Sequence, residues 1–115
     1  MKKSSEIFLK HILESIKYIE SFSKKLTKNK LINNRLRQNA IIRELEIIGE
    51  ATKNIPNSFR KKYPDVPWKG IAGMRDKLIH HYFGVDLNEV WDVIRGDLPK
   101  LKKQIQEILK SLGEN

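Results

Sequence analysis

Cysteine is absent from this 115-residue sequence, and histidine occurs only three times. Without cysteine the chain has no disulfide bond, no thiolate zinc site and no cysteine nucleophile; this suits a reducing compartment, and we expect a cytoplasmic protein. His80 and His81 are neighbours, and His11 has no partner at helical spacing. Because a zinc site needs several ligands at suitable spacings, we expect no metal centre. No cofactor is expected either, because glycine-rich phosphate loops and nucleophile elbows are missing.

Long apolar runs are missing as well. No stretch approaches the roughly 20 apolar residues that cross a bilayer, and residues 1–14 lack the apolar core and the cleavage site of a signal peptide. We therefore expect a mature N-terminus and no membrane segment. No segment alternates apolar and polar residues over the length of a strand, which argues against a β-sheet. The length fits a single domain, residues 1–115.

Positive charge is in excess, with a formal net charge of +9. Ten Lys and Arg against three acids give residues 1–37 a charge of +7, and six against two give residues 60–77 a charge of +4. Residues 78–99 hold one Arg and four acids, a charge of −3. Basic blocks attract nucleic-acid phosphates, here those of RNA. The same blocks would also suit binding to an anionic membrane surface or to an acidic protein, or they could simply keep helix faces solvated.

Apolar residues recur at steps of three and four, which predicts helices. We expect a first helix over residues 4–27 and a second over 31–54, which Pro56 stops. One helical turn is expected at 58–62, and a third long helix over 68–82, ended by Gly84. Within the second helix, Gly49 indicates close packing against a neighbouring helix.

Asp86 and Glu89 have the spacing of a capping box at the start of a fourth helix. Beyond them, eight apolar residues follow at alternating steps of four and three: Leu87, Trp91, Ile94, Leu98, Leu101, Ile105, Ile108 and Leu112. The phase continues through Gly96 and Pro99, so we expect one helix kinked near Pro99, with its seam in the core. The predicted fold is all-α, an up-and-down four-helix bundle with a short extra helix and a kinked C-terminal helix.

The residues that suit catalysis gather in segment 74–82, MRDKLIHHY. Histidine titrates near neutral pH and serves as general acid or base, while arginine offers a permanently charged fork to a phosphate. In the expected helix, His81 falls on the apolar stripe with Leu78 and would face the core. Arg75 and His80 would lie about 140° apart around that helix. Two copies could bring an Arg and a His together more easily, which predicts a homodimer.

The same segment resembles the signature of the HEPN superfamily, an arginine followed by a polar residue and, after a gap, a histidine. Arg75, Asp76 and His80 take those places. With Tyr82 the segment also resembles the longer form R-x-x-x-x-H-x-Y of HepT toxins from HepT–MntA toxin–antitoxin pairs. The surrounding sequences IRELEIIGEATKNIP and FRKKYPDVPWKGIAGMRDKLIHHYFGVDLNEVW are similar to that family too. The resemblance covers most of the chain, and residues 43–91 make it specific.

This resemblance implies a HEPN-like bundle that dimerises, with Arg75 and His80 of two subunits forming a metal-independent endoribonuclease site. Asp76 and His81 would support it, although His81 replaces the small or polar residue common in the family and is open to titrating or packing roles. The resemblance also implies an MntA-like nucleotidyltransferase antitoxin that adds AMP to Tyr82. The added charge and bulk would compete with RNA phosphate for Arg75.

Two other interpretations stay open. A non-catalytic HEPN subunit that binds nucleotide or the nucleotidyltransferase would keep the bundle, the dimer and Tyr82 without turnover. A small helical nucleic-acid-binding regulator would account for the charge, but it would leave the clustered Arg, His and Tyr unexplained.

Overall fold

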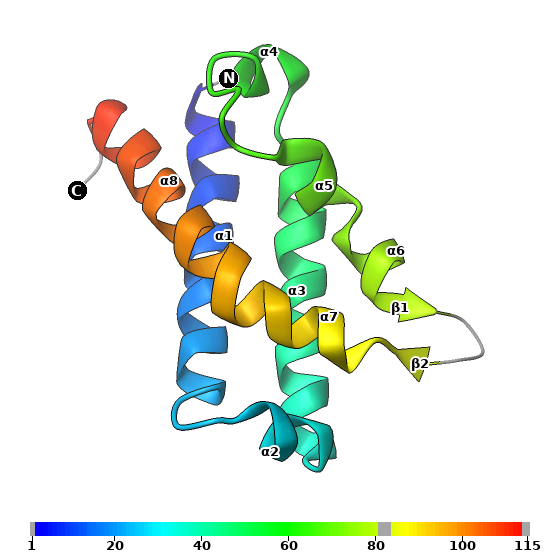
Figure 1. Ribbon diagram of the computed structural model, residues 1–115. Helices are drawn as coiled ribbons and strands as arrows, with labels where there is room; N and C mark the ends of the chain where they lie inside the picture. Colours follow the sequence, from blue (N-terminus) through cyan, green and yellow to red (C-terminus); the bar gives the residue numbers. More distant parts are fainter. Residues whose placement is uncertain (1, 81–83, 114–115) are drawn as a thin grey trace.

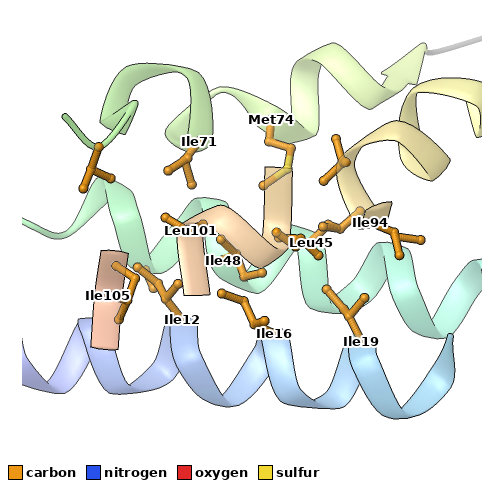
Figure 2. Close-up of a cluster of buried hydrophobic side chains, with 14 of the residues drawn as sticks. Ile12, Ile16, Ile19, Leu45, Ile48, Ile71, Met74, Ile94, Leu101 and Ile105 are labelled. Atoms are coloured by element: carbon orange, nitrogen blue, oxygen red, sulfur yellow. The ribbon is translucent and has the colours of Figure 1, made fainter. Parts of the chain in front are cut away.

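The computed structural model describes residues 2–80 and 84–113. Its two long N-terminal helices, α1 (Lys2–Phe22) and α3 (Arg35–Lys53), lie side by side (Figure 1). The apolar stripe that predicted α1 is buried, with Ile12, Ile16 and Ile19 at most 1% exposed. These side chains point toward α3 and the rest of the core (Figure 2). Within the described residues, no helix is long and apolar enough to cross a membrane.

The chain leaves α1 at Phe22, so the predicted end at residue 27 was wrong. A short helix, α2 (Lys28–Ile32), follows. It begins at this point because the Thr27 hydroxyl accepts a hydrogen bond from the Lys30 N–H at 3.1 Å, which satisfies one of the free N–H groups of the first turn.

The predicted second helix begins at Arg35 instead of residue 31. The side chain of Asn34 caps it by accepting a hydrogen bond from the Arg37 N–H at 2.9 Å. The Gln38 amide then reaches back to the last carbonyls of α2 and donates to Leu31 O at 2.8 Å and Ile32 O at 2.9 Å. Side-chain hydrogen bonds at both ends of α2 therefore separate this helix from α3, although the apolar pattern of the sequence looked continuous.

The connection after α3 contains α4 (Asn57–Arg60), which confirms the helical turn expected there. Arg60 closes the C-terminal end of α3, because its guanidinium donates to Thr52 O at 2.6 Å and to Ile55 O at 3.0 Å. The indole N–H of Trp68 donates to Tyr63 O at 2.9 Å. These bonds fix the irregular segment to the helices on both sides of it.

Two short helices, α5 (Trp68–Ala72) and α6 (Met74–Leu78), follow along α3 (Figure 1). The close packing predicted at Gly49 is confirmed here. A Cβ at this position would lie 3.4 Å from Ile71 O and 3.6 Å from Ala72 O. The backbone of α5 therefore lies directly against α3. Because α6 follows α5 at once in the chain, this contact also helps to place α6 along α3.

The helix predicted over residues 68–82 was wrong in two respects. It is interrupted at Gly73, and it ends at Leu78. The chain then becomes extended as β1 (Ile79–His80) and pairs antiparallel with β2 (Gly84–Val85), with His80 opposite Gly84. The part of the prediction that covers residues 81 and 82 falls outside the described residues.

The C-terminal part is one continuous helical rod, as predicted. It consists of α7 (Leu87–Asp92), a π-helical turn η1 (Val93–Asp97) and α8 (Leu98–Ser111), and the backbone stays helical at both joins. Proline cannot donate a hydrogen bond to the carbonyl four residues earlier. The irregularity expected near Pro99 takes the form of a wider turn that lies directly before it.

The seam of this rod lies in the core, as the sequence favoured. Its central members Leu98, Leu101, Ile105 and Ile108 are at most 5% exposed. Figure 1 shows α8 crossing α1. An ion pair also links the two helices, with the Lys102 ammonium 3.0 Å from the Glu20 carboxylate. The all-α class is confirmed, and the ladder β1–β2 is the one extended pairing in the part of the chain that the structure describes.

Candidate active site

The residues predicted for catalysis lie at the junction of α6 and β1, at the lower right of Figure 1. Arg75 and Asp76 belong to α6, where Asp76 is exposed, and His80 belongs to β1. His81 and Tyr82 fall outside the described residues, and so does the prediction that His81 faces the core.

This junction removes the reason that helix geometry gave for a dimer. On one continuous helix, Arg75 and His80 would lie about 140° apart. The helix ends at Leu78, however, and His80 follows in an extended segment. An angle around a common helix axis does not describe the two residues, so the helix-phase argument for the predicted homodimer no longer holds, while the family resemblance still implies one.

Leu78 anchors the junction to the fold. Its side chain is 2% exposed, and its carbonyl accepts a hydrogen bond from the Asp86 N–H at 2.9 Å. One helical turn earlier, Met74 is 7% exposed and points into the core (Figure 2). The segment between Leu78 and Asp86, which contains His80, is therefore tied at both ends.

Only the Asp86 half of the predicted capping box is confirmed, because the Asp86 N–H donates to Leu78 O and not to the Glu89 side chain. The Asp86 carboxylate accepts a hydrogen bond from the Glu89 N–H at 3.1 Å. The Glu89 carboxylate lies 3.6 Å from the Lys77 ammonium, so that the start of α7 is linked to the end of α6. The acids that follow the motif thus serve the local structure.

Gly84 is the residue of this region that sequence reasoning assigned to the wrong role. It does not end a helix. Its φ of +77° places it in β2 in a conformation that side chains disfavour. A signal for the strand pair was present, because Ile79 and Val85 are β-branched and pair with one another.

The sequence matches the family model described as "Ribonuclease HepT-like" over residues 12–108. The chain belongs to the HepT-like ribonuclease family. The predicted family and enzyme class, a ribonuclease, are confirmed by this match.

Relatives of this HepT-like chain bear similar descriptions. A Methanocaldococcus jannaschii protein described as "Gamma-glutamylcyclotransferase and putative RNase" is 50% identical over all of this chain, which spans 52% of that protein. A second protein of that organism, "Putative RNase", is 47% identical over 99% of this chain and 95% of its own length. The "Probable ribonuclease HepT" of Thermococcus cleftensis is 44% identical over 96% of this chain and 100% of its own. No solved structure matches the chain.

Residues 2–80 and 84–113 contain no cluster of three or more His, Asp or Glu side chains that could hold a metal ion.

Proposed function

We propose that this chain is a metal-independent endoribonuclease with Arg75 and His80 as its catalytic residues. Arg75 binds the scissile phosphate and offsets the charge that develops on it. His80 accepts the proton of the ribose 2′-hydroxyl or donates a proton to the leaving 5′-oxygen. The 2′-oxygen attacks phosphorus and the bond to the 5′-oxygen breaks, which leaves a 2′,3′-cyclic phosphate and a 5′-hydroxyl. Asp76 orients one of the two catalytic residues.

The α6–β1 junction in a chain of this ribonuclease family supports the proposal most directly. There the helix with Arg75 leads into the strand with His80. The neighbouring residues Asp76, Lys77 and Gly84 are exposed, so an RNA strand can approach this edge of the fold. Relatives named as ribonucleases favour turnover over a binding role without catalysis.

The proposed active unit is a homodimer. Cleavage through a cyclic phosphate needs one group that accepts a proton and another that donates one. Two copies of His80, facing one another across a two-fold axis, supply both groups. Two copies of Arg75 would bind the phosphate between them.

The proposed biological role is that of a toxin held in check by an MntA-like nucleotidyltransferase. The Tyr82 hydroxyl attacks the α-phosphate of ATP, diphosphate leaves, and the tyrosine proton passes to the nucleotidyltransferase. The adenylyl group would place negative charge and bulk two residues from His80. It would then compete with RNA for Arg75, because like charges repel at short range.

The purified protein is expected to cleave single-stranded RNA in EDTA and to have twice the 13.5 kDa mass of one chain in light scattering. Intact mass must first show that no adenylyl group is present. If the unmodified protein cleaves no RNA at high concentration, the proposed activity is wrong. Cleavage by a stable monomer would instead refute the shared site.

Incubation with the cognate nucleotidyltransferase and ATP is expected to add AMP to the parent and to abolish its RNA cleavage. Tyr82→Phe lacks the acceptor oxygen and should neither gain mass nor lose activity under the same conditions. Modification of the Phe variant to the parental extent, measured by intact mass, would contradict the assignment of Tyr82.

A further inference from the structure

The corner between α1, α2 and α3 contains a pocket walled by basic and amide side chains. We call it the corner pocket. It has a volume of about 410 Å³ and is lined by Lys24, Lys25, Lys30, Asn33, Asn34 and Arg37. No acid occurs in the sequence between Glu20 and Glu44, and Glu20 is itself paired with Lys102. Among the described residues, no ion pair neutralises the cations of segment 24–37.

These positive charges lie where helix dipoles disfavour them. Lys and Arg residues occupy the first turns of α2 and α3, and neither turn contains an acid. Helix N-termini carry partial positive charge, so cations there lower stability. The caps are the neutral Thr27 and Asn34, although aspartate caps a helix as well as asparagine does. The same chain uses Asp86 at the start of α7.

The backbone conformation of Lys25 also costs free energy, in addition to the electrostatic cost of the charges at the helix ends. Lys25 has a φ of +60°, the left-handed region, and it is the one non-glycine residue with positive φ in the described segments. This conformation brings Cβ close to the backbone and favours glycine or asparagine at the end of a helix. Such strain in a non-glycine residue motivates a functional hypothesis for its side chain, which the Lys25→Gly variant below tests.

Hydrogen bonds and core packing hold the helices around the corner pocket in place. Leu31 of α2 is fully buried, and Gln38 binds the two carbonyls at the end of that helix. The Asn33 amide donates to Asn29 O at 2.9 Å. Because these groups fix α2 against α3, an anion bound by the surrounding side chains would have little backbone to reorganise.

Figure 1 shows α2 at the bottom of the molecule and the α6–β1 junction at its right-hand side. Helix α2 packs against α7, and α7 packs against α6, which carries Arg75. The other basic block, residues 60–77, is partly committed to the fold. Arg60 closes the end of α3, and Lys77 pairs with Glu89.

We propose that the corner pocket binds the sugar–phosphate backbone of RNA away from the bond that is cut. The inference rests on the proposed ribonuclease function and names where a longer substrate is held. Cations that neutralise phosphates release counterions. The side-chain NH2 of Asn34 can donate to a phosphate or sugar oxygen, while that of Asn33 is bonded to Asn29. No aromatic residue lines the pocket for base stacking, so binding is salt-dependent and tolerant of sequence.

RNA fits this lining better than a protein or a membrane does. Protein interfaces bury apolar and aromatic side chains at their centres, and membrane-surface binding inserts apolar residues among the lipids. The lining consists of lysines, an arginine and asparagines. A ligand that presents a row of phosphates would satisfy these groups without any apolar burial.

The test compares two fourfold variants of the full chain, both in a His80→Ala background so that RNA stays intact. The pocket variant carries K24Q, K25Q, K30Q and R37Q, and the control carries K53Q, K100Q, K103Q and K110Q, which lie outside both basic blocks. Each lowers the formal net charge from +9 to +5. Binding of a labelled single-stranded RNA of about 20 nucleotides is followed by fluorescence anisotropy over a salt series.

The pocket variant is expected to lose affinity at least about tenfold. The salt slope of its binding should fall by about 0.7 for each phosphate that its side chains no longer neutralise. The control should lose much less affinity. An equal loss in both variants would mean general attraction by net charge and would overturn the proposal. So would an unchanged RNA affinity combined with weaker binding to ATP or to phosphatidylglycerol vesicles.

With His80 restored, a dinucleotide substrate too short to reach the pocket should be cleaved by the pocket variant at the parental rate, while KM for the long RNA rises. If the parent cleaves neither substrate, the proposed function fails, yet the binding comparison still decides the corner pocket. Lys25→Gly alone should weaken RNA binding without lowering Tm, because glycine accepts the positive φ. A lower Tm with unchanged RNA affinity would contradict a ligand-binding role for Lys25.

Discussion

His80→Ala is expected to slow RNA cleavage by about 100- to 10,000-fold, the range that general acid–base catalysis contributes. Arg75→Ala should cost about 100- to 1,000-fold, because it removes the donors that stabilise charge on the phosphate. Single-turnover cleavage of a labelled RNA in EDTA measures both rates. Combining the two substitutions should slow cleavage little further, since residues that act as a unit lose their effect together.

Lys77→Ala is the matched control for these variants. Lys77 lies in α6 between the two catalytic residues, its side chain is 65% exposed, and its ammonium is 3.6 Å from Glu89. An exposed pair of this kind contributes about 0–1 kcal/mol, so both cleavage and Tm should stay near the parental values. Arg75→Lys keeps the charge without the planar fork and should give an intermediate rate. Parental cleavage by His80→Ala and Arg75→Ala would remove the catalytic assignment and leave the family membership intact.

The parts of the fold that were predicted correctly depend on local periodicity. Ile12, Ile16 and Ile19 recur at the spacing of one helix face, and all three are buried. The cap at Asp86 acts over three residues and was equally visible in the sequence. Features that a helix builds within one or two turns can be recognised without knowing what packs against it.

The errors arose where partners distant in the sequence decide the structure. Met74 and Leu78 continue an apolar helical stripe, and nothing within that stripe shows that the helix ends at Leu78. Its end depends on Val85, which pairs with Ile79, and on the Asp86 N–H that binds the Leu78 carbonyl. Strand pairing is set by such tertiary contacts more than by intrinsic preference.

The sequence predicted which residues would form the candidate active site, but it did not predict how they are arranged in space. Arg75 and His80 were chosen for their chemistry and for the family resemblance, while their expected separation around a helix was wrong. For the corner pocket, the sequence showed the charge but not the site. The sequence placed an excess of charge over residues 1–37, but only the folded corner gathers Lys25, Lys30 and Arg37 around one hollow.

Leu78→Ala is expected to lower the free energy of unfolding by about 2–5 kcal/mol, the range for buried leucines replaced by alanine. The side chain is 2% exposed, so its removal leaves a cavity between α6 and the helices that cover it. Leu36→Ala is the control, because Leu36 is 80% exposed on α3. The same change in chemistry there should alter stability by no more than about 0.5 kcal/mol. Urea unfolding at equal m-values measures both differences.

Leu78 also connects core packing to catalysis, because His80 follows it by two residues and the Leu78 carbonyl holds Asp86. If β1 moves to fill the cavity, His80 moves with it. The cleavage rate of Leu78→Ala should then fall by a larger factor than the fraction of folded protein does at the same temperature. If the core relaxes from the side of α3 instead, activity will follow the folded fraction alone. Measuring both at a temperature where the variant is still folded therefore separates the contribution of Leu78 to stability from its contribution to the position of His80.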